Sequence, residues 1–238
     1  MIRNCIAAGL VLFSATLGMA GDNLKGTKVL NVGGGSSHDY NRWFNQEDSA
    51  ILAAAGARVE YTDKTETVRE KLAGAKVLCL SINQPWKDKA APPAIMDFAQ
   101  DPSKGILIVH AGTWYNWKDW NEYNRVLVSG GARGHDRLGE FEVTVTDPKH
   151  PIMKGVPKTF KITDELYNFI PDETSPSSRI VLATGKSPVT GKVFPLVWIT
   201  KGPKAKIVCI TLGHDARAHE LPAYRAILTN SANWVAGR

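Results

Sequence analysis

Three of the six histidines, His38, His110 and His214, each follow an apolar run that is typical of a buried strand. In an open α/β sheet, ligands collect beyond the carboxyl ends of the strands. Imidazole is an acid–base group near neutral pH, and in its neutral form it is the commonest metal ligand. The pattern predicts one shared site. Its imidazoles either act directly on a substrate or bind a metal such as zinc, and satisfied local hydrogen bonding is the structural alternative.

Two acidic residues and a fourth histidine are candidates for the same site. Asp164 and Glu165 could supply a general base or orient a histidine, and the alternative is a solvated carboxylate pair. His135 follows a glycine and is expected to border the cleft as a substrate-binding residue. No local motif such as His-Glu-x-x-His is present, so the sequence leaves the metal undecided. Catalytic roles are expected for His110, His214, Asp164 and Glu165, and a substrate or metal contact for His38.

Three aromatic residues are candidates for stacking on a sugar ring. Tyr40, Trp114 and Trp198 each offer an apolar ring face, although aromatic side chains also fill cores. Trp114 is expected on the rim of the site, because residues 114–117 (WYNW) directly follow His110 and are too polar for a core run. Of the histidines that remain, His150 is expected in a turn at the surface, and His219 near the start of the last helix is expected as a surface or capping residue.

The elements that position these residues alternate in the first half of the chain. Strands are predicted at 27–32, 58–61, 76–82 and 105–109, and helices at 46–55, 65–72 and 92–100, with another helix within 114–128. This alternation predicts right-handed βαβ crossovers and a mostly parallel sheet flanked by helices. After residue 130 the pattern changes to strands at 141–145, 160–162, 179–183 and 194–199. The last of these is joined by a hairpin-like turn to a strand at 207–212, and a helix at 222–236 ends the chain.

Composition limits the class of protein. The chain has 238 residues, of which 43% are hydrophobic and 22% charged, as in ordinary globular proteins. Its formal charge of +6 comes from scattered basic residues without a clustered stripe, so nucleic-acid binding is not expected. No repeat or low-complexity linker is present, and we expect a single domain from about residue 22 to 238.

Residues 1–20 have the layout of a secretory signal peptide, with a basic start, an apolar centre and a small-residue exit. A membrane-spanning helix needs about 20 apolar residues, and this apolar run is shorter. The protein is therefore expected to be exported, to the periplasm or beyond, with no membrane span after cleavage. Cys79 and Cys209 fall in predicted strands as small hydrophobes, and a disulfide between them requires adjacent strands.

Two familiar motifs are incomplete. Gly33, Gly34 and Gly35 follow a strand, but His38 stands where a dinucleotide fingerprint has its third glycine, and aromatic residues follow instead of an immediate helix. The turn at residue 110 could be a nucleophile elbow, yet it carries imidazole in place of serine or cysteine, and Thr113 has no evident base. Neither a nicotinamide enzyme nor a covalent hydrolase is expected.

The sequence nevertheless resembles the ThuA-like family, the trehalose-utilisation proteins, over nearly the whole mature chain. The residues that carry the resemblance are His38-Asp39, 109–112 (VHAG), Gly134-His135, 163–167 (TDELY), 195–198 (PLVW), 212–215 (LGHD) and Trp234. The resemblance implies the flavodoxin-like fold of class I glutamine amidotransferases, with an added β-rich segment at about 131–200 here. It also implies a role in carbohydrate metabolism, on disaccharides or their keto forms.

The amidotransferase relatives carry a catalytic cysteine in a Cys-x-Gly turn that matches His110-Ala111-Gly112 here. Imidazole supplies no thiolate nucleophile, so glutaminase activity is not expected. The leading hypothesis is an exported hydrolase, lyase or isomerase that acts on a small sugar or keto-sugar by histidine-based, metal-assisted or direct acid–base chemistry. The alternative is a non-catalytic carbohydrate-binding protein on the same fold.

Overall fold

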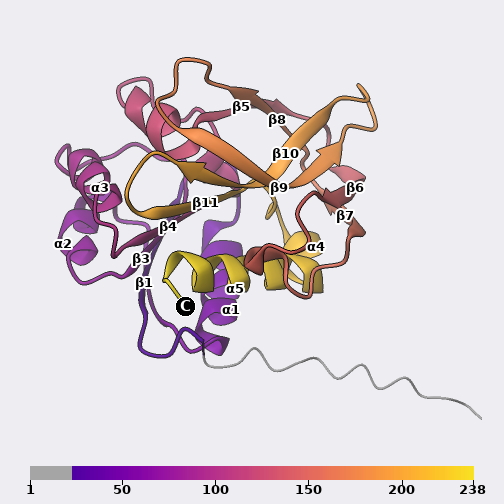
Figure 1. Ribbon diagram of the computed structural model, residues 1–238. Coiled ribbons are helices and arrows are strands. Elements are labelled where there is room, and N and C mark those ends of the chain that lie inside the picture. Colours follow the sequence, from indigo (N-terminus) through magenta and orange to yellow (C-terminus); the bar gives the residue numbers. More distant parts are fainter. Residues whose placement is uncertain (1–22) are drawn as a thin grey trace, which may run out of the picture.

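The computed structural model describes residues 23–238, so the predicted signal peptide lies outside the described residues. Within residues 23–238, no helix combines the length and apolar character needed to cross a membrane. The chain of these residues forms a nine-stranded sheet with helices on both sides and a separate two-stranded sheet (Figure 1).

Five parallel strands form one half of the large sheet, in the order β2-β1-β3-β4-β11. They are β1 (Lys28–Gly34), β2 (Arg58–Thr62), β3 (Val77–Ile82), β4 (Gly105–Val109) and β11 (Lys206–Ile210). This is the flavodoxin-like strand order, in which the first two strands pair side by side and the next three follow on the other edge of β1. The predicted parallel sheet is confirmed.

Four antiparallel strands extend the sheet beyond β11, in the order β10-β9-β6-β7. They are β6 (Gly139–Val145), β7 (Thr159–Asp164), β9 (Ser178–Lys186) and β10 (Val193–Lys201). The sequence analysis did not predict the strands of the small sheet, β5 (Gly130–His135) and β8 (Tyr167–Pro171). They pair with a register shift after Ala132, and three of the first five residues of β5 are glycines, so periodicity gave no signal there.

The helices bury the two faces of the parallel strands. On one face lie η1 (Asn41–Asp48), which continues into α1 (Ser49–Ala54), and α5 (Pro222–Val235). On the other lie α2 (Val68–Leu72), α3 (Ala91–Ala99) and η4 (Tyr123–Val128). Short turns of helix complete the chain: η2 (Thr65–Thr67), η3 (His110–Thr113), η5 (Pro151–Met153) and α4 (Ala216–His219).

Side chains of the central strands alternate between these two cores, as the pleat requires. In β3, for example, Val77 and Cys79 join the core under α5, whereas Leu78 and Leu80 join the opposite core. Cys209 also lies in the opposite core, and β4 separates its strand from β3. Both cysteines are free, and their placement on opposite faces of the sheet excludes a disulfide between them.

Helix boundaries differ from the predictions at two places. The helix expected at 46–55 begins earlier, with η1, because Trp43 and Phe44 are buried and give this segment an apolar face. The helix expected within 114–128 is confined mainly to η4, since Trp117 and Trp120 pack into the core from an irregular segment. Prolines near the start of α3 and α5 suit the first turn of a helix, and both helices lie where they were predicted.

Candidate functional site

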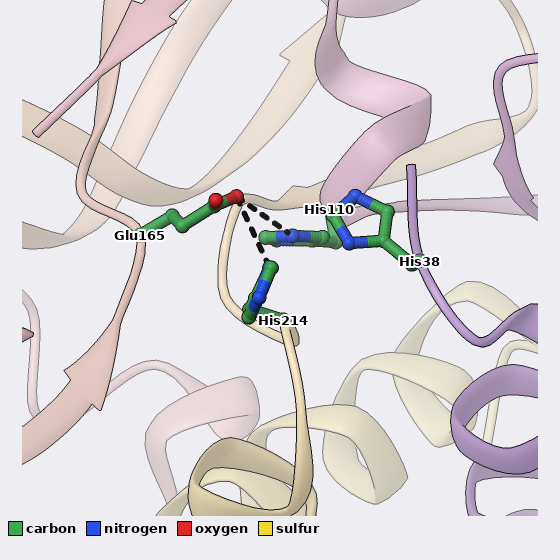
Figure 2. A group of neighbouring side chains, drawn as sticks. All are labelled: His38, His110, Glu165 and His214. Carbon is green, nitrogen blue, oxygen red and sulfur yellow. Dashed lines mark ion pairs between the residues drawn. The ribbon is translucent and has the colours of Figure 1, made fainter. Parts of the chain in front are cut away.

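The three histidines predicted to share a site meet at the carboxyl edge of the parallel strands. His38 lies in the loop after β1, His110 begins η3 directly after β4, and His214 follows β11. The ring centroid of His38 is 4.6 Å from that of His110 and 5.0 Å from that of His214, and the last two are 5.8 Å apart. Figure 2 shows these rings converging with the carboxylate of Glu165.

A strained turn presents His110. Its φ of 45° is in the left-handed region, which few residues other than glycine adopt. Gly112 allows the turn to pass close to β3, because a Cβ at that position would lie 2.3 Å from the carbonyl oxygen of Leu80. Such strain persists only where the surrounding structure holds it, and it clusters at functional sites. The turn drives the His110 ring, which has no exposed surface, into the cluster.

The tautomer of His110 follows from its backbone partner. Its Nδ1 lies 2.7 Å from the carbonyl oxygen of Thr211, which can only accept, so Nδ1–H is the donor. The Nε2 atom therefore carries the free lone pair when the ring is neutral. Burial lowers the pKa of His110 far below its ordinary value, and the neighbouring His38 lowers it further, so the neutral form holds at physiological pH.

Two buried nitrogens of the cluster, His38 Nδ1 and His110 Nε2, have no hydrogen-bond partner, and His214 Nδ1 faces only the Glu165 carboxylate, at 3.2 Å. Burial, aided by His214, lowers the pKa of His38 to about 4, so that ring is neutral as well. Buried polar atoms in native proteins are normally paired, so two unpaired imidazole nitrogens beside a third histidine call for a shared partner.

Glu165 supplies the negative charge of the cluster. Its Oε2 lies 3.2 Å from His214 Nδ1 and 3.7 Å from His110 Nε2, while its Oε1 lies 3.6 Å from His135 Nδ1. Burial alone raises the pKa of Glu165, but the contacts with His214 and its neighbours outweigh it and lower the pKa below its ordinary value. Glu165 is thus a carboxylate, and it raises the pKa of His214 in return.

These four residues fit a metal ion. One ligand atom from each of His38, His110, Glu165 and His214 lies within 4.8 Å of all the others. In a tetrahedral zinc site with bonds of about 2.1 Å, the ligand atoms are about 3.4 Å apart. The distances from Glu165 Oε2 to His214 Nδ1 and His110 Nε2, 3.2 Å and 3.7 Å, lie on either side of this value.

Asp164 lies behind the cluster and does not line the cleft. It is buried, and its carboxylate accepts from the backbone N–H groups of Gly213 at 2.8 Å, His214 at 3.2 Å and Glu165 at 2.7 Å. Burial raises its pKa to about 6 even though these three bonds oppose the shift. Of the two roles expected for Asp164, this placement fits the one of orienting its neighbours.

A pocket of about 280 Å³ opens beside the cluster. It is lined by Ser37, His38, Asn83, Ala111, Trp114, Asn116, His135, Glu165 and Tyr167, without a lysine or arginine. Trp114 therefore lies at the rim, where it was expected, and packs on Tyr167 with ring centroids 5.2 Å apart. His135 also lies at the cleft. Asn83 and Asn116 were not predicted, although Asn83 directly follows the buried strand β3 as His110 follows β4, and Asn116 lies shortly after η3.

Two of the expected sugar contacts lie elsewhere. Trp198 on β10 has no exposed surface, packs on Phe169 and donates its indole N–H to the carbonyl of Val128, so that expectation is wrong. Tyr40 is 5% exposed and does not line the pocket. Its ring packs against His38 and its hydroxyl bonds Ser37, so it supports the site from behind.

The expectation for His219 is also wrong, because the residue has no exposed surface. The ring bonds the carboxylate of Asp48 through Nδ1 and the carbonyl of Gly213 through Nε2. The partner comes from η1, 171 positions earlier in the chain, so local sequence could not reveal it. His150, by contrast, is partly exposed and accepts from the N–H of Ile152 in a turn.

Solved structures with a similar fold include two ThuA-like proteins. One, from Parabacteroides merdae, is 21% identical and has a TM-score of 0.75, with 88% of this chain and 90% of that chain covered. The other, from Bacteroides uniformis, is 19% identical and has a TM-score of 0.71, with 94% and 95% covered. The CTPS glutaminase domain of Trypanosoma brucei, solved with bound acivicin, is 11% identical, with a TM-score of 0.52 and coverage of 88% and 93%.

These likenesses show a fold shared with glutamine amidotransferases. Comparison with curated proteins gave no significant match. The family model of ThuA, described as trehalose utilisation, matches residues 28–235, which include every element from β1 to α5 and all four residues of the histidine–glutamate cluster. The chain therefore belongs to the ThuA family.

Proposed function

We propose that this protein is an exported enzyme that acts on a small sugar or keto-sugar by histidine-based acid–base chemistry with a bound divalent metal such as zinc. The proposal rests on one observation: three imidazoles, two of them with buried unpaired nitrogens, converge with one carboxylate beside a pocket. Three imidazoles with a further oxygen donor are a familiar donor set for zinc. Neutral rings at His38 and His110 support metal binding, because a ligand must offer its lone pair.

A bound zinc ion would supply Lewis acidity toward a carbonyl or hydroxyl oxygen. With His38, His110 and His214 holding the metal, one position would stay open for that oxygen, and the proton transfers would fall to Glu165 and His135. Glu165 is ionised, lies at the pocket wall and has its Oε1 3.6 Å from His135 Nδ1. His135 Nδ1–H donates to the carbonyl of Asp136, so its Nε2 is left to exchange protons at the open end of the pocket. Groups placed in this way typically contribute about 10²–10⁴-fold to a rate.

The lining of the pocket favours an uncharged, hydroxylated ligand. Asn83 and Asn116 offer amide oxygens to sugar hydroxyls, because their amide nitrogens donate within the protein, and Trp114 offers an apolar ring face. The lining contains no lysine or arginine to bind a phosphate or carboxylate away from the metal. The family description, trehalose utilisation, agrees with a neutral sugar. The leader-like residues 1–20 support export.

Glutaminase activity is not part of the proposal. The turn at residue 110 carries imidazole, which cannot form the acyl-thioester of a cysteine enzyme. The two cysteines of the described chain, Cys79 and Cys209, are fully buried in strands, and burial raises the pKa of both thiols. Neither can provide a thiolate to the pocket.

The test begins with the mature protein purified without chelators or a histidine tag. We expect about one equivalent of metal by elemental analysis and turnover in a product screen of disaccharides and their 3-keto derivatives. His110→Ala should abolish turnover with a modest effect on sugar affinity, whereas the control His150→Ala should retain activity. Absence of metal, with none taken up, would remove the metal from the proposal. Saturable sugar binding without turnover would instead indicate a non-catalytic carbohydrate-binding protein.

A further inference from the structure

We propose that the buried pair Asp48–His219 is a positioning unit that fixes the turn carrying His214. The inference rests on the proposed role of His214 in the cluster. Asp48 ends η1 and His219 ends α4, and neither lines the pocket. The pair therefore acts through the backbone between β11 and α4, and not by contact with a substrate.

The two side chains form a closed network. His219 Nδ1 lies 2.8 Å from Asp48 Oδ1, and the hydroxyl of Tyr224 on α5 donates to both oxygens of that carboxylate at 3.1 Å. The His219 ring also stacks on Trp43, with centroids 5.6 Å apart and planes inclined by 20°. Three elements, η1, α4 and α5, thus fix the position and the plane of one imidazole.

Hydrogen-bond chemistry fixes the direction in which His219 acts. Its Nε2 lies 2.9 Å from the carbonyl oxygen of Gly213, and a carbonyl can only accept. Nε2 must therefore carry a proton and donate it. Nδ1 faces a carboxylate, so the second proton lies between His219 and Asp48. The imidazole cannot turn its ring over without losing one of these two bonds.

The backbone at Gly213 is held from both sides. Its carbonyl accepts from His219, and its N–H, like that of His214, donates to Asp164. The φ of Gly213 is +126°, a conformation that residues with a Cβ rarely adopt. Two buried carboxylates, one directly and one through an imidazole, therefore clamp the turn from which the His214 ring enters the cluster.

These contacts with the backbone at Gly213 are expected to affect the position of the His214 ring more than the stability of the fold. Partners that orient metal ligands typically change metal affinity or activity by about 10–100-fold when they are removed. The Asp48–His219 pair orients the peptide that precedes a proposed ligand, so its loss should loosen the position of the His214 ring.

The test compares Asp48→Ala, which removes both the partner of His219 Nδ1 and the acceptor of Tyr224, with Leu228→Ala, a control on α5 that removes apolar packing without touching the network. We would measure the Zn²⁺ dissociation constant by chelator competition and amide hydrogen exchange at Gly213 and His214. Asp48→Ala should weaken Zn²⁺ binding about 10–100-fold and speed exchange at both amides more than at the amides of β11. Leu228→Ala should change neither selectively. Tyr224→Phe, which keeps the pair, should give a smaller effect and replaces Asp48→Ala if that variant does not fold.

The outcomes separate this inference from the proposed function. Unchanged zinc affinity and unchanged exchange in the variants, beside a wild type that binds zinc, would overturn the positioning role and leave the proposed function intact. A wild type that binds no zinc would overturn the metal site. In that case hydrogen exchange at Gly213 and His214 decides the positioning role without zinc: selective loss of protection supports it, and unchanged protection overturns it.

Discussion

The two halves of the large sheet contribute to the site in different ways. The parallel half supplies His38, His110 and His214 from loops at one edge, where the carboxyl ends of its strands lie together. The antiparallel half supplies Glu165 from the short connection between β7 and β8. Burial keeps His38 and His110 neutral, whereas Glu165 from the other half carries the negative charge and raises the pKa of His214. The flavodoxin-like core therefore supplies only imidazole nitrogens, and the added strands supply the carboxylate that completes the cluster.

The largest effect that tests this division is expected from Glu165→Gln. The amide keeps the shape of the side chain but removes the negative charge and the basic oxygen, so turnover should fall about 10²–10⁴-fold. Steady-state kinetics on the substrate found in the screen would measure it. Glu140→Gln on β6 is the matched control, because that carboxylate is exposed and pairs only with Lys161. Equal losses in the two variants would contradict a special role for Glu165.

A smaller effect is expected at the pocket rim. Trp114→Ala removes an apolar ring face from the pocket, which should raise KM about tenfold with a lesser change in kcat. Trp198→Phe is the comparison in the antiparallel half. It removes the indole N–H that bonds the Val128 carbonyl and should lower the free energy of unfolding by about 1–3 kcal/mol while leaving KM unchanged. If Trp198→Phe raised KM and Trp114→Ala did not, the sugar contact would lie on β10.

The smallest effect is expected in the pH dependence of stability. Burial alone lowers the pKa of His219, but the Asp48 carboxylate and the Gly213 carbonyl outweigh it and hold the pKa above 6.5. A raised pKa stabilises the fold fully below the unfolded value, and this contribution is lost as the pH rises through the folded pKa. Each unit of raised pKa corresponds to about 1.4 kcal/mol.

Denaturant unfolding from pH 6 upward should therefore show a decline in wild-type stability that His219→Gln lacks. Identical pH profiles for the two proteins would show that the His219–Asp48 pair has the same protonation in the folded and unfolded chains. The comparison uses the difference between the proteins, so other titrating groups cancel to first order.

The parallel half could be predicted well from the sequence because its strands are short apolar runs bounded by glycine. His110 follows Val109 without an intervening residue, and the rule that ligands bind at this edge places it with His38 and His214. The location of these three side chains therefore follows from topology. The tautomers of the rings, the strained backbone at His110 and the unpaired nitrogens do not follow from topology. They depend on contacts such as the one between His110 Nδ1 and the Thr211 carbonyl.

The antiparallel half was harder to predict. Glu165 and Asp164 are adjacent in sequence, yet one faces the pocket and the other is buried under Gly213. Nothing in the local pattern distinguishes them, because the backbone that binds Asp164 and the histidines that face Glu165 come from distant parts of the chain. Trp198 was predicted to contact a sugar because its ring can stack on one. Its neighbours in the strand are apolar, however, and this pattern is equally typical of a core residue. His219 shows the same limit, since its burial depends on an aspartate 171 positions away.

The turn after β4 has a consequence for how reactivity can change in this architecture. Its course is set by the backbone, with an unusual φ at residue 110 and a glycine two positions later pressed against β3. Whatever side chain occupies the first position is delivered to the same buried point. A single codon change there can exchange one kind of chemistry for another while the scaffold stays intact.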